Sequence, residues 1–293
     1  MEIRLLRYFW VVAEEKNFSR AAQVLNVTQP TLSRQIKDLE ETIGTPLFER
    51  GPRELQLTED GLFLKERAEE ILQLNAKLEK DFLDRQNKEL SGSFSIGCVE
   101  ADNSDTVAMM LEEVLADHPQ VSFDLVTGTS DEISDKLEKG ILDLAVLLEP
   151  VTLNAVESLR LPREEKWGFL VSSSSFAAQQ DCITPADILG MPLLLSKRKE
   201  VRELLSAWAK IPVEDFNVIG AYNLIFNVFA LVENRVGSAF AIEGAISNRK
   251  SEGTKFVPLM PEVKTNCVLV WKKRMHTPVV EEVIRRFKYA FKA

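Results

Sequence analysis

Residues 18–39, FSRAAQVLNVTQPTLSRQIKDL, decide the fold of the amino-terminal part of the chain. They predict two short helices joined by a tight turn. We expect Ser19 to cap the first helix, and Asn26 suits the turn because it tolerates left-handed backbone. We expect Thr28 to cap the second helix, where Pro30 costs little because it falls within the first turn. This layout is typical of a helix-turn-helix that reads DNA.

The second of these helices is predicted to be amphipathic. Its apolar residues recur at spacings of four, three and four, which predicts one buried stripe. The stripe consists of Leu32, Ile36, Leu39 and Ile43. We expect the polar face to enter the major groove of DNA, where Arg pairs with guanine and Gln with adenine. The predicted DNA-binding residues of this helix are Gln29, Thr31, Ser33, Arg34 and Lys37.

The residues after this helix predict a hairpin, or wing. In residues 44–61, GTPLFERGPRELQLTEDG, the turn at Gly51-Pro52 separates two short apolar segments. Arg50 and Arg53 flank its tip, and we expect them to contact phosphates or the adjacent minor groove. Taken alone, the helix pair also fits an ordinary pair with a solvated polar face. The wing argues against that alternative.

The amino-terminal pattern resembles that of LysR-type transcriptional regulators. The resemblance rests on SRAAQVLNVTQPTLSRQIKDLE, PLFER and LTEDG, is strongest in residues 1–65, and extends more loosely over the full length. It implies an α/β protein with a winged helix-turn-helix, a long linker helix and a two-lobed α/β effector domain resembling periplasmic solute-binding proteins. The implied partners are a double-stranded DNA operator, a small-molecule effector, further copies in a homodimer or homotetramer, and RNA polymerase if the protein is an activator. The family's DNA-contacting positions fall on Gln29, Thr31, Ser33, Arg34, Arg50 and Arg53.

A long helix is predicted from residue 58 to about residue 87, because this run has no proline and, after Gly61, no glycine. We expect Thr58 to cap it. Apolar residues recur at alternating spacings of four and three, as in a coiled-coil seam, with one amide among them. That amide either fixes the register between two copies or is solvated at the edge of the seam. The predicted dimerisation residues are Leu64, Ala68, Ile71, Asn75, Leu78 and Phe82.

The remaining residues predict two α/β lobes. Strands and helices alternate from residue 94 to residue 148, and a similar set opens at 166–171, which predicts parallel sheets with helical crossovers. The predicted domains are a winged helix-turn-helix at 1–58, a linker and dimerisation helix at 59–90 and an effector-binding domain at 91–293. Within the last, lobe I takes about 91–160 and 267–293, and lobe II about 161–266.

Ligands of open α/β sheets collect beyond the carboxyl ends of strands and at the amino ends of the helices that follow. The loops at these points are mostly polar, although Ser130 and Asn223 precede helices and are equally well explained as plain caps. Two carboxylates in these loops would repel an anion, whereas Lys197 and Arg198 offset them, so a zwitterion or an amine-bearing ligand stays open. The predicted effector-binding residues are Glu100, Ala101, Asp102, Thr129, Ser130, Ser196, Arg198, Tyr222 and Asn223.

Composition limits the class of protein. With 293 residues and 45% hydrophobic content, the chain has room for two or so domains. It has no run of 18 uncharged apolar residues, and charged Glu2 and Arg4 argue against a signal peptide, so we expect a cytoplasmic protein that does not contact a membrane. Cys98, Cys182 and Cys267 show no CxxC pattern, so we expect neither a disulfide framework nor structural zinc, and no cofactor. Whether any of them is redox-active stays open.

No catalytic apparatus is recognisable, and we expect no enzyme. Only His118 and His276 are present, neither in a metal-ligand spacing, and the serine run at 172–175 lacks a glycine elbow. Two other classes stay open: a ligand carrier similar to solute-binding proteins, and an architectural DNA-binding protein that needs no effector. The carrier leaves residues 1–90 unexplained, and the architectural protein needs no cleft. The sequence does not name the operator, the effector or the sign of regulation.

Overall fold

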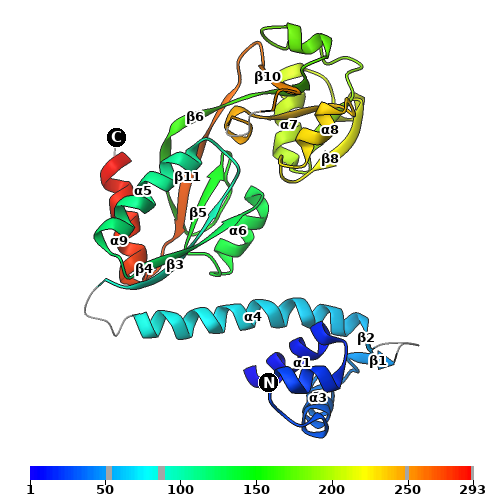
Figure 1. Cartoon of the computed structure of the whole chain (residues 1–293), viewed down its shortest axis with the longest axis vertical. Helices are drawn as coiled ribbons and strands as arrows, with labels where there is room; N and C mark the ends of the chain where they lie inside the picture. Colours follow the sequence, from blue (N-terminus) through cyan, green and yellow to red (C-terminus); the bar gives the residue numbers. More distant parts are fainter. Residues whose placement is uncertain (51–54, 85–89, 248–250, 292–293) are drawn as a thin grey trace. The chain divides into compact units, whose positions relative to one another are not determined.

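The structure, a computed structural model, describes residues 1–50, 55–84, 90–247 and 251–291. The chain divides into two compact units, Met1–Leu83 and Asp84–Ala293 (Figure 1). The elements of the first unit are α1 (Ile3–Glu15), α2 (Phe18–Val24), α3 (Gln29–Ile43), β1 (Phe48–Arg50), β2 (Leu55–Leu57) and α4 (Glu59–Asp84).

Helices α2 and α3 form the predicted helix-turn-helix. The Asn17 side chain caps α2 by accepting from the backbone N–H groups of Ser19 and Arg20 at 2.9 and 3.1 Å. The expectation that Ser19 is the cap was therefore wrong: Ser19 supplies a donor, and the cap lies two residues earlier. Asn26 adopts the left-handed turn conformation, with φ of 54°. Thr28 caps α3 as expected by accepting from the Thr31 N–H.

The core of this unit lies between α1, α2, α3 and the start of α4. Three members of the predicted stripe, Leu32, Ile36 and Leu39, are buried at 2% exposure or less. Ile43 is 39% exposed and is not part of it. The reason is that α3 ends there, at a left-handed Gly44, beyond the reach of the core.

The wing is fixed to the helices by hydrogen bonds at its base. Strands β1 and β2 pair antiparallel, with Phe48 opposite Leu57. The Glu40 carboxylate on α3 accepts from the Leu47 N–H at 2.7 Å. Thr58 caps α4 as predicted, because its hydroxyl accepts from the Gly61 N–H at 3.0 Å. The tip of the hairpin, residues 51–54, lies outside the described residues.

The second unit is built on one sheet that runs through two lobes, with strand order β4-β3-β5-β11-β6-β9-β7-β8 and β10 paired to β6. Its strands are β3 (Gly92–Cys98), β4 (Val121–Thr127), β5 (Leu144–Leu148), β6 (Val156–Ser172), β7 (Leu193–Ser196), β8 (Val218–Tyr222), β9 (Ser238–Ile242), β10 (Thr254–Pro258) and β11 (Lys264–Lys272). Its helices are α5 (Asn103–Asp117), α6 (Ser130–Glu138), α7 (Lys199–Ala209), α8 (Val228–Glu233) and α9 (Pro278–Phe291), with single 3-10 turns η1 (Phe176–Gln179), η2 (Val213–Asp215) and η3 (Glu243–Ala245).

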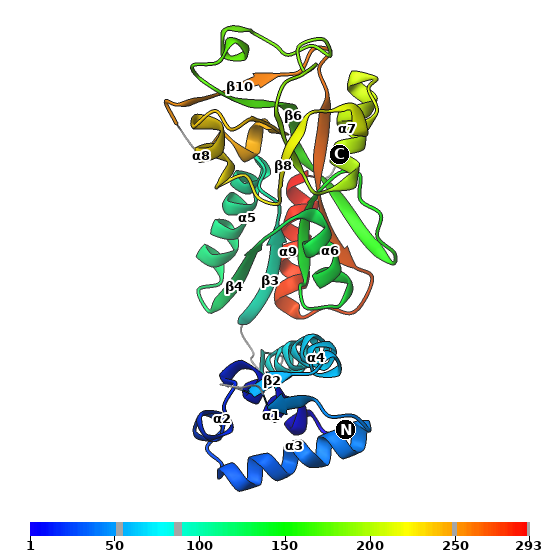
Figure 2. The same ribbon diagram turned by 90° about the vertical axis from the view of Figure 1, so that its right-hand side faces the viewer.

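The two lobes repeat one arrangement. In lobe I, β3 pairs in parallel with β4 and β5; in lobe II, β7 pairs in parallel with β8 and β9. These parallel pairs are the predicted crossover units. The antiparallel strands β6 and β11 pass from one lobe to the other, as Figures 1 and 2 show. A hinge of two continuous strands therefore joins the lobes.

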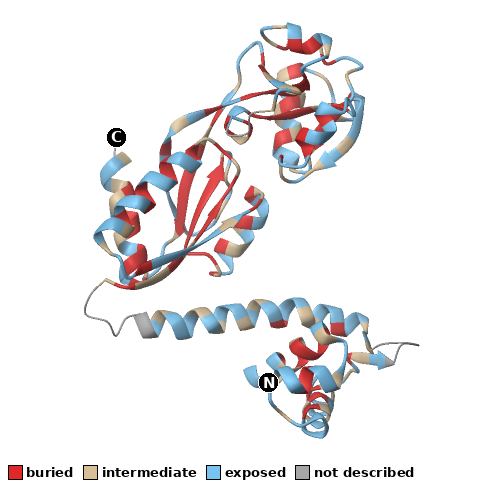
Figure 3. Ribbon diagram, viewed as in Figure 1, coloured by how far each residue is buried: buried red, intermediate tan, exposed pale blue. Residues whose placement is uncertain are grey.

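The degree of burial differs between the elements of the two units. The inner strands β3, β5 and β9 of the second unit are largely buried, whereas the edge strands β4 and β8 and much of α4 are exposed (Figure 3). One apolar cluster extends from Phe94 and Ile96 of lobe I to Phe169 and Phe240 of lobe II. Among the described residues, no helix has both the length and the apolar character needed to cross a membrane.

Candidate functional site

The polar face of α3 is open to solvent. Gln29, Arg34 and Lys37 are exposed, and Ser33 is half-buried. The exposed Thr31 hydroxyl lies 2.7 Å from that of Thr28. The first turn of α3 holds no acidic side chain, so the positive end of its dipole is free to face phosphate. The surface has the chemistry to contact both base edges and the DNA backbone.

The two predicted wing residues cannot be placed in the same way. Arg50 is the last residue of β1, opposite Leu55, and its side chain lies outside the described residues. Arg53 also lies outside them. The wing contacts stay predictions.

The long helix α4 divides into two parts by burial. Ala68 is fully buried in the core of its own unit, and Leu64 packs against the same core. Ala68 was therefore a wrong choice for a seam that faces another copy, because the first turns of α4 complete the winged helix-turn-helix. Asn75 donates to the Glu79 carboxylate at 3.0 Å. The exposed apolar residues further along are Ile71, Leu74, Leu78 and Phe82.

A cavity of about 100 Å³ lies between the two lobes of the second unit. It opens where β3 and β5 of lobe I end opposite β7 and β8 of lobe II. The predicted residues that line it are Glu100, Thr129, Ser130, Ser196, Arg198, Tyr222 and Asn223. The structure thus brings together polar residues from four loops that are far apart in the sequence.

Two predicted residues of this site were wrong. Ala101 is 3% exposed and belongs to the apolar core. Asp102 points to Arg163, with an ion-pair distance of 3.0 Å. Neither lines the cavity. The cause is the start of α5 immediately after them, which turns both residues away from the cleft.

The structure also changes which residues act as caps. Thr129, not Ser130, caps α6: its hydroxyl accepts from the Glu132 N–H, and the Glu132 carboxylate accepts from the Thr129 N–H. The Ser130 hydroxyl accepts from the Leu148 N–H at 3.4 Å. Asn223 is exposed and lies well before α8, which begins at Val228, so it does not cap that helix.

The apolar wall of the cavity was missed by sequence analysis. Trp167 of β6 is 3% exposed and stacks on Phe240 of β9, with ring centroids 4.8 Å apart. Its indole Nε1 is buried and has no hydrogen-bond partner among the described residues. An unpaired buried donor beside a cavity is unusual, because such groups are nearly always satisfied. The alternation of KWGFLV indicates that Trp167 is buried, but not that β6 borders the cleft.

Several polar groups at the cavity already bind protein atoms. The Tyr222 hydroxyl donates to the Phe240 carbonyl at 2.6 Å, and burial raises its pKa above the ordinary value. Arg198 and Glu100 each bond to main-chain atoms of the opposite lobe. These side chains are therefore held in place by the fold.

A buried carboxylate lies at the hinge. Glu165 of β6 is 1% exposed and accepts from the Asp102 N–H at 2.8 Å and from the Asn103 side chain at 3.3 Å. Burial raises the pKa of this carboxyl. Its burial could not be predicted from the sequence, because one acidic residue in a strand that also holds Glu164 gives no signal of burial.

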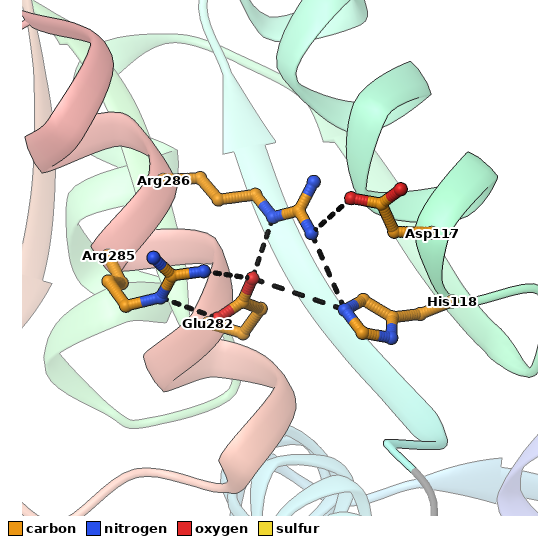
Figure 4. A network of polar contacts seen from close by, with 5 residues as sticks. All are labelled: Asp117, His118, Glu282, Arg285 and Arg286. Carbon is orange, nitrogen blue, oxygen red and sulfur yellow. Dashed lines mark hydrogen bonds and ion pairs between the residues drawn. The ribbon is translucent and has the colours of Figure 1, made fainter.

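Two of the cysteines are buried, and one histidine lies in an ion network. Burial raises the pKa of the Cys98 thiol to about 12 and also raises that of Cys267, so neither thiol is activated. His118 lies in an ion network of α5 and α9, 3.4 Å from an Arg286 nitrogen and 4.0 Å from Glu282 (Figure 4). No group of three or more His, Cys, Asp or Glu side chains suited to a metal occurs among the described residues.

Comparison with known proteins covers the whole chain. Residues 3–62 match the family described as bacterial regulatory helix-turn-helix protein, lysR family, and residues 87–292 match the LysR substrate binding domain. The transcriptional activator IlvY of Salmonella typhimurium is 27% identical over 291 residues, covering 96% of this chain and 97% of IlvY. The Hca operon transcriptional activator HcaR of Escherichia coli is 28% identical over 295 residues, covering 97% and 96%. The crystal structure of CbnR, a LysR family transcriptional regulator, has the same fold, with a TM-score of 0.78 at 21% identity over 100% of both chains.

Proposed function

The chain belongs to the LysR family of bacterial helix-turn-helix regulators, and from this membership we propose that its interlobe cavity binds a small anion that alters DNA binding. It is a DNA-binding transcriptional regulator with an effector-binding domain. The observation that carries the proposal is the cavity between the lobes, which is lined by polar residues from both lobes and by Trp167, whose buried indole N–H has no partner among the described residues.

The donors at the cavity favour an anion over an amine. Trp167 is one of the lining residues, and its indole N–H, which has no partner among the described residues, can donate to an anion but cannot accept from an amine. The two carboxylates that would favour an amine are engaged, because Asp102 pairs with Arg163 and Glu100 accepts from Ile225. A carboxylate-bearing ligand therefore fits better than the zwitterion or amine that the sequence left open.

The cavity volume limits the size of the ligand. The space between the lobes amounts to about 100 Å³, which favours a small ligand. A ligand with a handful of non-hydrogen atoms fits this space, whereas a larger ligand requires the lobes to separate. Small aliphatic carboxylates are the first class to test.

DNA is read by the exposed face of α3, with the wing adding phosphate contacts. Gln29 and Arg34 are the proposed base readers, and Lys37, Arg50 and Arg53 the proposed backbone contacts. Two copies joined through the exposed stripe of α4 would read half-sites one helical turn apart, about 34 Å, or a multiple of it. We propose the domain division 1–58, 59–90 and 91–293 on the same basis.

The proposed cellular location, oligomeric state and further partner follow from the role as a DNA-binding regulator. A regulator that reads chromosomal DNA works in the cytoplasm as a homo-oligomer, either a dimer or a tetramer. Two relatives are named as activators, and an activator of this kind would contact RNA polymerase. We propose no catalytic step for the cavity residues.

Two measurements test the proposal. Selection from a randomised duplex library by the full-length protein should enrich one sequence, and Arg34→Ala should lose that enrichment. Calorimetry with a panel of small carboxylates should find a ligand whose affinity falls in Trp167→Phe, which lacks the indole N–H. Trp208→Phe is the matched control, because the Trp208 N–H donates to the Pro261 carbonyl outside the cavity. Equal affinity in Trp167→Phe and the wild type would place the ligand elsewhere.

A further inference from the structure

Two charged side chains cross between the lobes beside the cavity. Arg198, which follows β7 in lobe II, donates to the carbonyl oxygens of Leu148 and Pro150 in lobe I at 3.2 and 2.9 Å. Glu100, which follows β3 in lobe I, accepts from the Ile225 N–H in lobe II at 2.8 Å. Each lobe therefore holds the main chain of the other through one charged group.

The charge around Arg198 favours a bridging role over ligand capture. Its side chain is only 10% exposed, and its Nε lies 3.4 Å from carboxylate oxygens of Asp131 in lobe I and Glu200 in lobe II. The guanidinium is thus close to two acidic groups, one of them across the cleft, although its buried Nε makes no hydrogen bond among the described residues. An incoming anion would have to compete with both carboxylates.

A third contact shows how closely the lobes approach. Gly244 lies in η3 of lobe II, and a Cβ at this position would be 2.2 Å from the Asp102 backbone nitrogen of lobe I. It would also lie 2.2 Å from the Glu165 carboxylate at the hinge. No side chain fits there unless the lobes move apart or the local backbone shifts.

We propose that Arg198, Glu100 and Gly244 form an interlobe latch. This latch sets the difference in free energy between the joined and the separated arrangement of the lobes, which an effector must overcome to shift them. The bonds join main-chain atoms of one lobe to charged side chains of the other, so separation of the lobes breaks them together. Charge-assisted hydrogen bonds are stronger than neutral ones, so the latch favours the joined arrangement without a bridging ligand. An effector then shifts the lobes only by its difference in affinity between the two arrangements.

The three residues are positioning residues in this account. Arg198 and Glu100 line the cavity, yet their role is to hold the lobes and not to select the ligand. The link to regulation rests on the proposed function, whereas the latch is a property of the two lobes alone. Its test therefore uses neither ligand nor DNA, and its failure would leave the calorimetric test of the cavity unaffected.

Residue-resolved hydrogen exchange of the full-length protein tests the latch at the Ile225 amide. Glu100→Ala should speed exchange there by on the order of tenfold, because the amide loses a charged acceptor. Arg198→Gln should also speed it, although Arg198 does not bond to Ile225, and Gly244→Ala should do the same. Arg198→Lys, which keeps the charge and can reach one carbonyl, should give an intermediate rate.

Arg202→Gln is the matched control. Arg202 lies one helical turn further along and donates to the Ser196 carbonyl within lobe II, so its loss should leave Ile225 exchange unchanged. Amides of β11 serve as the check that a variant is still folded. Slow exchange of the β11 amides would show that Arg198→Gln and Arg198→Lys are folded. If both variants then exchange at Ile225 at the wild-type rate, the interlobe contacts of Arg198 and Glu100 are independent, and the latch is overturned.

Discussion

The two units of this chain carry their functional groups in opposite ways. On α3 and along α4, the residues proposed to bind DNA or a second copy are exposed, as with Arg34 and Leu78. In the second unit, the groups around the cavity are buried or bonded to the protein itself, as with Trp167 and Arg198. Substitutions should therefore cost binding in the first unit and folding stability in the second. Single substitutions in each unit test this division.

The largest effect is expected for Leu78→Asp. Leu78 is 54% exposed on α4 and lies outside the core of its own unit. If α4 joins two copies, the substitution buries an unpaired carboxylate from each copy at a cost of several kcal/mol. Sedimentation should show monomers, and operator affinity should fall by about a hundredfold or more. Gln73→Asp, on another face of α4, should stay oligomeric. Dimers of Leu78→Asp would show that α4 is not the interface.

Trp167→Ala should give the next largest effect, on stability. Removal of a buried, stacked indole costs about 3–5 kcal/mol, because it leaves a cavity in the core. Trp167→Phe should cost less than Trp167→Ala, since a phenyl ring still stacks on Phe240, a smaller cavity is left and the lost N–H had no protein partner. Chemical denaturation measures both. A small loss for Trp167→Ala would show that the cavity wall does not belong to the core.

Arg34→Ala should cost binding and leave folding unchanged. We expect about 1–3 kcal/mol of lost operator affinity per half-site if Arg34 contacts a base. The melting temperature should stay at the wild-type value, because Arg34 is exposed. Fluorescence anisotropy measures the affinity, with Arg67→Ala on α4 as an arginine control outside α3. Equal affinity of Arg34→Ala and the wild type would remove α3 from the reading surface.

The smallest effect concerns acid stability at Glu282. Hydrogen bonds from Arg285, then Arg286, lower the pKa of this carboxyl to about 2. A carboxyl with a lowered folded pKa stabilises the protein above its unfolded pKa, and that stability is lost as pH falls from about 4.5 to about 2. Glu282→Gln should lose about 1–2 kcal/mol at neutral pH, allowing for the exposed Arg285 side of the pair. It should also show a shallower decline in acid.

Thermal unfolding at pH 7 and at pH 3 measures this difference. Glu281→Gln, at the neighbouring exposed position, is the control and should behave as the wild type. A Glu282→Gln variant with wild-type stability at both pH values would show that the network in Figure 4 contributes nothing to folding.

The contrast between exposed groups in the first unit and buried or bonded groups in the second also explains which features could be predicted from the sequence. The face of α3 and the Thr58 cap follow from local spacing, and the structure has both. Ala68 was assigned to the wrong surface because the same helical spacing fits two roles, packing within the unit and contact with a second copy. At the start of α4 the apolar residues pack within their own unit. No feature within α4 marks where that role ends.

The cavity was predictable only in part. Strand ends predicted polar loops such as those of Ser130 and Ser196, because parallel topology brings these ends together. The partners of those loops depend on contacts between distant segments. Asp102 pairs with Arg163, and Arg198 reaches Leu148, which no local pattern reveals. Trp167 borders the cleft because β6 crosses the hinge, and that position of β6 depends on the order of the strands in the sheet.

The central claim is that a ligand in the interlobe cavity is coupled to DNA binding, and reciprocal titration tests it most directly. Operator affinity is measured with and without a carboxylate found by calorimetry, and the affinity for that carboxylate is measured with and without operator. Thermodynamic linkage requires the two ratios to be equal. The account predicts equal ratios that differ from one in the wild type and fall to one in a variant that no longer binds the carboxylate. A carboxylate that binds in the cavity with the same affinity whether or not operator is present would contradict it.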